Sequence, residues 1–323
     1  MRRLTPSVVQ IHYPPRMTIE QAAHSLSKGH LVSFPTETVY GLGADAENLE
    51  AINRLYEVKG RPKDHPVIVH IADVSKLNYW ASKIPEYAND LAKRFWPGPM
   101  TLLLPRSSNA VDAITGGQDV VGIRIPSHPI AQELLSRFQE LGGNGVVAPS
   151  ANRFGNVSPT SAEAVREELG DFLSADDVII DGGECEVGIE STIIDCTGIS
   201  PRILRLGAIT EAMINEVAPL TSQPAKSEIK ISGSLPRHYS PKAKVLLDAV
   251  PIEGDGYIAT SEFETPKGVV RLASPTSTKE FAHDLYQALR NGDRLGLSRI
   301  VIRQPEGDGL AAAIRDRLHR ASN

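Results

Sequence analysis

Polar residues that could bind a ligand gather directly after one predicted strand. The apolar run 31–34 is typical of a buried strand, and Pro35 ends it. An open α/β sheet holds small ligands with polar groups placed where a strand ends, so we expect a ligand site here. Two glycines later in the segment free the backbone to turn. The segment contains Thr36, Glu37, Thr38, Tyr40, Gly41 and Gly43.

Three cations follow within five positions, namely Lys59, Arg61 and Lys63, separated by Gly60 and Pro62. A cation at the end of a helix complements the helix dipole, which explains one of the three. Three cations around a glycine and a proline exceed what the dipole needs. We therefore favour a site for a phosphate or a carboxylate over a solvated surface.

Each further polar candidate is weak evidence for a ligand site by itself, but together, as an ordered set, they are stronger evidence. Arg124 lies in the apolar segment 121–126, where it is either at the rim of the sheet or paired with an anion. A structural salt bridge and a ligand contact both remain open for it. Ser150 and Asn152 follow a short predicted strand and are also typical turn residues. Ser191 resembles a helix cap or the polar start of a strand.

The elements that must position these residues alternate irregularly between helix and strand. This pattern predicts an α/β fold with a twisted mixed open sheet and flanking helices, rather than a purely parallel sheet. Apolar spacing and capping residues predict helices at 18–27, 48–58, 75–81, 86–95, 130–138, 161–169 and 210–217, and strands at 31–34, 67–71, 101–104, 120–125, 145–148, 178–180, 192–195 and 202–206.

A segment with four prolines and little periodicity, 218–244, is interpreted as a long linker. The pattern beyond it predicts a second, smaller α/β domain. We therefore divide the chain into a main domain at 1–217, a linker at 218–244 and a small domain at 245–323. The small domain has predicted strands at 245–247, 257–259, 269–272 and 300–302, and predicted helices at 279–290 and 310–319.

The composition is that of an ordinary globular protein, with 323 residues of which 41% are hydrophobic and 23% charged. A net charge of −5 argues against a protein whose main task is coating nucleic acid, but it allows a local basic cleft. Two cysteines and nine histidines form no disulfide framework and no metal-spaced cluster. The basic start, 1–6, lacks the apolar core of a signal peptide, and no apolar run reaches membrane-spanning length. We expect a cytoplasmic protein.

Two other functions compete with a phosphate-handling enzyme. Residues 41–46 fit a relaxed dinucleotide-binding fingerprint, but the next predicted helix begins only near Asn48. A pyrophosphate would then not lie on a helix N-terminus, as that motif requires. The second alternative is a module that holds RNA in a basic concavity without chemistry. The acidic net charge and the scarcity of aromatics near the cations count against it.

Taken in order, the motifs PTETVYGLG, KGRP, PVIVH, GIRIP, PSAN and ESTI resemble those of the threonylcarbamoyl-AMP synthase family in its longer, two-domain form. The resemblance implies a YrdC-like catalytic domain, a linker and a C-terminal α/β domain. It implies a nucleotidyltransferase that joins L-threonine, bicarbonate and ATP into threonylcarbamoyl-AMP and releases pyrophosphate. A separate transferase complex would then deliver the threonylcarbamoyl group to an adenosine beside the tRNA anticodon.

The resemblance also implies roles for individual residues. Lys59, Arg61 and Arg124 would act in catalysis, with a magnesium ion, by positioning and charge neutralisation. No side chain is implied as a magnesium ligand, because this ion binds mostly through phosphates. The L-threonine pocket would be lined by Thr36, His70, Arg124, Ala148 and Ser191. The nucleotide would contact Lys59, Arg61, Lys63, Ser150, Asn152, Ser158, Arg205 and Tyr239.

The linker carries a histidine and a tyrosine together, His238 and Tyr239, in the motif HYSP. A spacer has no use for this pair, whereas a lid that stacks on a nucleotide does. By resemblance, this motif folds over the active site. We therefore predict that the linker is mobile without ligand and becomes ordered over the phosphates when a nucleotide is bound.

Overall fold

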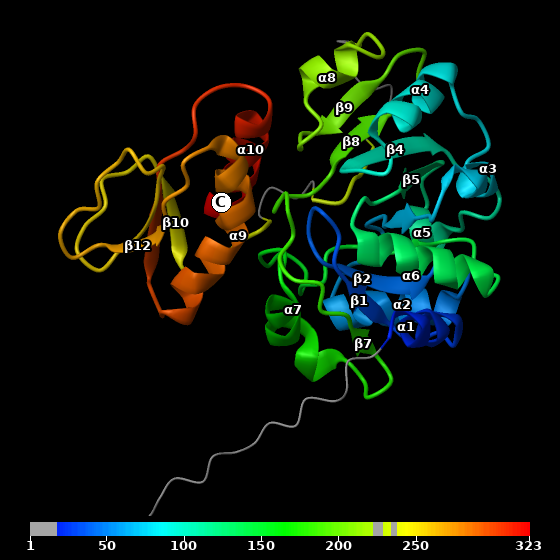
Figure 1. The fold of residues 1–323 in the computed structure, drawn as a ribbon, viewed down its shortest axis with the longest axis horizontal. Helices are drawn as coiled ribbons and strands as arrows, with labels where there is room; N and C mark the ends of the chain where they lie inside the picture. The colour runs from blue at the N-terminus through cyan, green and yellow to red at the C-terminus, as the bar shows by residue number, and fades with distance from the viewer. Residues whose placement is uncertain (1–17, 222–228, 234–237) are drawn as a thin grey trace, which may run out of the picture.

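The computed structural model describes residues 18–221, 229–233 and 238–323. Figure 1 shows two units side by side, one built on strands within residues 32–205 and the other on strands within residues 244–302. The predicted α/β class, with a mixed main sheet and a second, smaller domain, is confirmed. The domain boundaries stay a prediction. The start of the chain and linker residues 222–228 and 234–237 lie outside the described residues, and so do the predictions that fall on them.

The main sheet has nine strands within the described ranges, in the order β7-β1-β2-β6-β3-β5-β4-β8-β9. It mixes directions: β3 with β5 and β4 with β8 are parallel, whereas β4 with β5 and β8 with β9 are antiparallel. The strands are β1 (Val32–Phe34), β2 (Gly41–Asp45), β3 (Ile68–His70), β4 (Met100–Pro105), β5 (Val120–Arg124), β6 (Val146–Val147), β7 (Val178–Ile179), β8 (Thr192–Asp195) and β9 (Arg202–Arg205).

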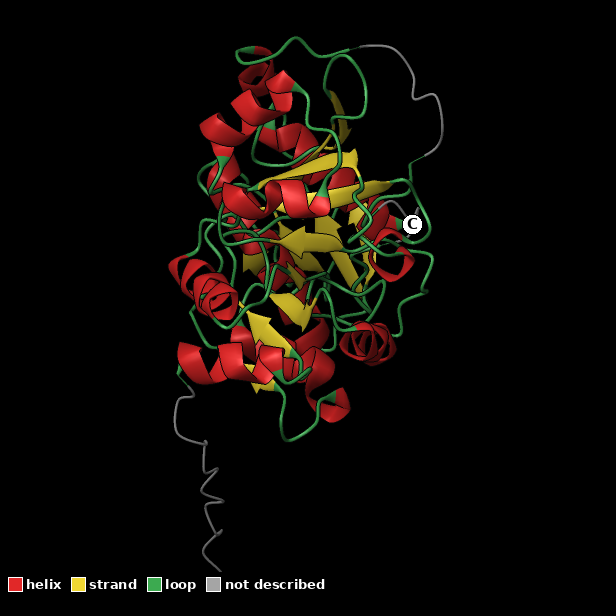
Figure 2. Ribbon diagram, turned by 90° about the vertical axis from the view of Figure 1, so that its right-hand side faces the viewer, coloured by secondary structure: helices red, strands yellow, loops and turns green. Residues whose placement is uncertain are grey.

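Helices flank this sheet on both sides (Figure 2). Several begin at a side-chain cap: Asn48, which the sequence predicts, and also Thr18 and Ser161 each accept a hydrogen bond from a backbone N–H of the first turn. The helices of the main domain are α1 (Ile19–Ser27), α2 (Leu49–Lys59), η1 (Val74–Lys76), α3 (Leu77–Trp80), α4 (Glu86–Phe95), α5 (Asp112–Thr115), α6 (Pro129–Glu140), α7 (Ala162–Leu169), η2 (Gly170–Phe172) and α8 (Glu211–Asn215).

The two faces of the main sheet are covered differently. Side chains alternate between faces along a strand, so Val69 and Ile123 belong to one face while His70 and Arg124 belong to the other. The first face carries a continuous apolar core that includes α2 and α4. The second face is covered by α1 and α6 near β1, but near β5 and β8 it meets polar residues and the linker, where Ile231 packs against it. This second face therefore leaves room for a site.

The small domain has a parallel sheet in the order β10-β13-β11-β12. Figure 1 shows its two helices on the side that faces the main domain. They pack there against Val39, Val157 and Ile189 of the main domain. Nowhere in the described ranges is a helix long and apolar enough to span a membrane. The elements are β10 (Lys244–Leu247), β11 (Gly256–Ile258), β12 (Val270–Ala273), α9 (Thr278–Arg294), β13 (Arg299–Ile302) and α10 (Leu310–Ser322).

The expected turn at Gly41 and Gly43 is wrong, because both glycines lie in β2, which pairs antiparallel with β1. Neither has a positive φ. A Cβ on Gly43 would lie 2.9 Å from both the Phe34 ring and the Val146 side chain. The glycine is thus required for close packing on the sheet, not for a turn. This strand also excludes the dinucleotide-binding fingerprint, in which the same glycines form a loop.

Two smaller differences come from short elements. The single helix predicted at 75–81 is η1 followed by α3, and α5 was not predicted. Both α3 and α5 have only four residues, so too few positions show a helical period. Gly188 packs against α9 with φ +80°, where a side chain would collide with the backbone of Ala282.

Candidate active site

A small hollow lies over the second face of the main sheet, and linker residues contribute to its wall. The sequence predicted polar groups at strand ends, and several lining residues lie there: His70 and Arg124 end β3 and β5, and Ser191 directly precedes β8. The volume of the hollow is about 50 Å³, well below the roughly 300–1,000 Å³ of typical ligand pockets. The predicted site residues that line it are Arg61, His70, Arg124, Ala148, Ser150, Ser191, Arg205 and Tyr239.

Arg124, the last residue of β5, forms an ion pair with Glu37 in the wall of the hollow. Its Nη2 lies 2.7 Å from Oε1 of Glu37, and Oε2 accepts a 3.0 Å hydrogen bond from the backbone N–H of Ser127. Each side chain of the pair is only 6% exposed. Nε of Arg124 has no hydrogen-bond partner among the described residues. The salt bridge that the sequence left open is therefore present, and Nε is still a donor that a ligand could use.

His70 ends β3 directly beside Arg124. Burial, together with the charge of Arg124, lowers the pKa of His70 to about 3, so the ring is neutral at neutral pH. Its Nδ1 lies 3.3 Å from the carbonyl oxygen of Ile68. Thr36 does not line the hollow, because its hydroxyl donates to the carbonyl oxygen of Val39 at 2.6 Å. The Thr36 hydroxyl thus fixes the loop after β1.

Lys59, the last residue of α2, holds the loop that follows β6. Its Nζ donates to the carbonyl oxygens of Ser150 at 2.5 Å and Asn152 at 2.6 Å. Burial, reinforced by the charge of Arg61, lowers the pKa of Lys59 well below its usual value. Asn152 donates from its side chain to the carbonyl oxygen of Arg153 at 2.8 Å. Lys59 and Asn152 therefore lie behind the hollow and shape its wall.

Arg61 and Arg205 line the hollow near the linker. Arg61 donates to the carbonyl oxygen of Pro66 at 2.8 Å and to the hydroxyl of Ser232 at 3.2 Å. Arg205 donates to the carbonyl oxygens of Ser191 at 3.0 Å and Ser232 at 2.8 Å. Burial lowers the pKa of both guanidiniums, and within the described residues neither forms an ion pair. Among these residues no carboxylate therefore contacts either guanidinium, although the charge of Glu190 acts on Arg205 at longer range, and both can bind an anion.

Two serines of the predicted site differ in their placement. Ser191 directly precedes β8, so it is the polar start of a strand, and its hydroxyl lies 2.8 Å from that of Thr101. It also accepts a 3.2 Å hydrogen bond from Nη2 of Arg205. Ser158 does not line the hollow and donates to Oε1 of Glu190 at 2.7 Å. Ser191 can contact a ligand as placed, whereas Ser158 holds a neighbouring carboxylate.

The linker residues His238 and Tyr239 are buried in the wall of the hollow. The Tyr239 ring stacks on Tyr286 of α9 with centroids 5.6 Å apart, and Arg317 of α10 lies 5.6 Å from its centroid. Burial lowers the pKa of His238 to about 3 and raises that of Tyr239 to about 12, so both are neutral at neutral pH. The predicted pair therefore reaches the site, although Tyr239 stacks on the small domain while the His238 ring meets Phe154 of the main domain. Ligand-dependent ordering of the linker stays a prediction.

Lys63 lies apart from the other candidates. It is exposed, and its Nζ donates to the side-chain oxygen of Asn53 at 2.7 Å. Three buried charged residues around the hollow are absent from the predicted set: Glu37, Glu190 and Arg317. The sequence did offer a signal for the two glutamates, because each is a carboxylate within a motif whose other residues suggest anion binding. No signal in the sequence places α10 beside the main domain.

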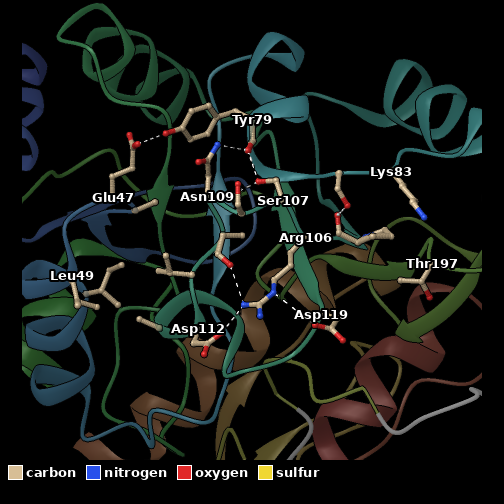
Figure 3. Close-up of a pocket in the computed structure, with 18 residues that line it drawn as sticks. Glu47, Leu49, Tyr79, Lys83, Arg106, Ser107, Asn109, Asp112, Asp119 and Thr197 are labelled. Atoms are coloured by element: carbon tan, nitrogen blue, oxygen red, sulfur yellow. Dashed lines mark hydrogen bonds and ion pairs between the residues drawn. The ribbon is translucent and has the colours of Figure 1, made fainter.

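A larger hollow of about 1260 Å³ lies elsewhere on the main domain (Figure 3). None of the predicted site residues lines it. Two of its charged residues pair with each other, since Arg106 lies 2.6 Å from Asp112, and the Glu47 carboxylate accepts a hydrogen bond from the Tyr79 hydroxyl. No group of three or more His, Cys, Asp or Glu side chains able to hold a metal occurs in the described part of the chain. The hollow with the arginines is the better candidate site.

Two family models together match almost the whole described chain. A model described as telomere recombination matches residues 24–207, and one described as the C-terminal domain of threonylcarbamoyl-AMP synthase matches residues 209–323. Fold and site thus define a two-domain α/β class with an arginine-lined hollow beneath a linker. The chain belongs to the threonylcarbamoyl-AMP synthase family.

Known relatives agree over nearly full length. The chain is 42% identical to a threonylcarbamoyl-AMP synthase of Pyrococcus abyssi, over 94% of each chain. It is 37% identical to one of Bacillus subtilis, over 94% of this chain and 92% of the relative. A crystal structure of Pyrococcus abyssi Sua5 complexed with L-threonine is similar, with a TM-score of 0.83, 38% identity and 94% coverage of each chain.

Proposed function

We propose that this protein makes threonylcarbamoyl-AMP from L-threonine, bicarbonate and ATP. The threonine nitrogen attacks the carbon of bicarbonate to give a carbamate and water. A carbamate oxygen then forms a bond to the α-phosphorus of ATP, and the bond to the β-phosphate oxygen breaks, so that pyrophosphate leaves. The observation that carries this proposal is the buried pair Arg61 and Arg205, whose positive charge has no carboxylate partner within the described residues.

The amino acid would bind at the end of the hollow near β5. There Nε of Arg124 is a free donor within the described residues, and the Ser191 hydroxyl lies at the start of β8. Neutral His70 and the methyl group of Ala148 complete a small wall. A carboxylate on Arg124 and a hydroxyl on Ser191 would suit threonine. This assignment is supported by the relative whose structure was solved with L-threonine.

The nucleotide would bind at the end near the linker, with its phosphates on Arg61 and Arg205. Lys59 and Asn152 would support it by holding the Ser150 loop. Magnesium would enter as part of the substrate MgATP, since it keeps most of its waters and binds through phosphates. A volume of about 50 Å³ is too small for ATP. The linker with Tyr239 must therefore move outward as the nucleotide enters.

Pyrophosphate release tests the proposal directly. Purified protein with L-threonine, bicarbonate and MgATP should release pyrophosphate, and omission of threonine or of bicarbonate should abolish most of it. Release that ignores both would contradict the proposal, and no release with RNA binding would favour the RNA-binding alternative. We further propose a cytoplasmic location and a transferase complex acting on tRNA as the consumer of the product. Addition of such a complex with tRNA should convert adenosine beside the anticodon only when this protein is present.

A further inference from the structure

A carboxylate lies in the wall of a hollow that should bind anions. Glu190 directly precedes Ser191 and lines the hollow together with Arg205. Left alone, its charge would repel phosphates and attract the nearby guanidinium. Its Oε2 instead lies 2.8 Å from Nε of Arg317, on α10 of the small domain. The hydroxyl of Tyr286, on α9, donates to the same oxygen at 3.0 Å.

The environment of Glu190 favours the ionised carboxylate. Burial opposes ionisation, but the charges of Arg317 and Arg205 outweigh it and lower the pKa of Glu190 to about 2. The Arg317 side chain is fully buried, at 0% exposure. Breaking such a pair leaves an uncompensated buried charge that must find another partner. Because Arg205 lines the same hollow, it is the cation on the main domain that Glu190 would then attract.

We propose that Arg317 and Tyr286 of the small domain are positioning residues that bind Glu190 and so keep Arg205 available for the phosphates of the substrate. The inference rests on the proposed function, because it assigns the phosphates to Arg205. It gives the small domain a role in the reaction: its helices α9 and α10 supply the counter-charge that the main domain lacks. Arg317 also donates to the carbonyl oxygen of Leu206, the residue after Arg205, at 2.8 Å.

A second ion pair between the same domains provides a matched control. Arg290 of α9 lies 3.1 Å from Glu168 of α7, and both side chains are largely buried. This pair does not line the hollow. A role limited to joining the domains would make the two pairs equivalent, whereas the proposed role makes only Arg317 important for anion binding.

The test compares Arg317→Met, Glu190→Gln, the double variant and Arg290→Met in the full chain. Affinity for inorganic pyrophosphate is measured by calorimetry, and KM for MgATP by pyrophosphate release. Arg317→Met should weaken pyrophosphate binding and raise KM by about tenfold or more, the scale of one lost charge-assisted contact. The double variant should regain most of the affinity, because the neutral amide of Glu190→Gln no longer attracts Arg205. Arg290→Met should lower the unfolding temperature but leave both binding values within about twofold.

Equal losses in Arg317→Met and Arg290→Met, or no recovery in the double variant, would overturn the proposal. If Arg317→Met does not fold, Tyr286→Phe removes only the contacts of the Tyr286 hydroxyl with the Glu190 carboxylate and should raise KM to a smaller extent, again reversed by Glu190→Gln. The calorimetric arm separates this inference from the proposed function. A parent protein that binds pyrophosphate but never forms it would contradict the function alone.

Discussion

The two ends of the hollow differ in how their buried cations are compensated. Near β5, Arg124 pairs with Glu37 at 2.7 Å, and the neighbouring His70 is neutral. Near the linker, Arg61 and Arg205 donate to backbone carbonyls and serine hydroxyls, and among the described residues neither forms an ion pair. A buried charge is costly unless it is paired. At the first end the buried cation is thus paired with a carboxylate before a ligand binds, which suits a zwitterion. At the second end the buried cations have no ion-pair partner among the described residues, which suits a polyphosphate.

Among the variants, Arg124→Met should cause the largest loss of stability, because it leaves the Glu37 carboxylate buried without its cation. Breaking a buried pair in this way costs about 3–5 kcal/mol of folding free energy. Chemical denaturation measures the loss, and threonine-dependent pyrophosphate release should disappear with it. The double variant Arg124→Met with Glu37→Gln should recover much of the stability but not the activity. If the single variant is as stable as the parent, Arg124 is not the cation that neutralises Glu37 at the first end.

Arg61→Ala should lower activity without lowering stability. No buried carboxylate loses a partner within the described residues, so the free energy of unfolding should stay the same or rise. Loss of a charge-assisted contact to phosphate costs about 1.5–3 kcal/mol, which corresponds to a tenfold or greater drop in kcat/KM for MgATP. Steady-state kinetics and denaturation on the same preparation measure both. Normal kinetics in a folded variant would show that this end does not bind the nucleotide.

The pH dependence of stability tests the neutrality of the first end. His70 has a pKa of about 3 in the folded protein, against about 6.5 in an unfolded chain. The unfolded chain therefore binds the proton first, and stability falls as the pH is lowered from about 6.5 towards 3, by up to about 1.4 kcal/mol per pH unit. Denaturation measured between pH 7 and pH 4 should show a smaller loss of stability for His70→Gln than for the parent. His24→Gln, at an exposed position of α1, is the control, and equal behaviour of both variants would contradict the prediction.

Lys63→Ala should have the smallest effect, although Lys63 lies in the same motif as Arg61. The side chain is exposed and bonded to Asn53 on the surface of α2. We expect changes within about 0.5 kcal/mol in both stability and the activation free energy. A drop in kcat/KM comparable to that of Arg61→Ala would mean that Lys63 swings into the hollow when the nucleotide binds, as the family resemblance implies.

The sequence by itself predicted most elements and half of the residues that line the hollow. Apolar periodicity and capping residues are local signals, so α2 with its cap Asn48 and strands such as β5 were found close to their observed bounds. The ordered motifs include Arg61 and Arg124, the family resemblance that they carry implied Arg205 as well, and all three line the hollow. These features depend on neighbouring residues or on motif order, and both are visible in a linear sequence.

The tertiary structure decided which charges meet. The segment with Gly41 and Gly43 forms β2, and Phe34 and Val146 pack where a side chain on Gly43 would lie. The fold placed Lys59 behind the hollow and Lys63 on the surface, although the two are only four positions apart. Whether a buried cation is neutralised depends on its partner in space, and the ion pair between Glu190 and Arg317 joins residues of different domains that no local pattern connects.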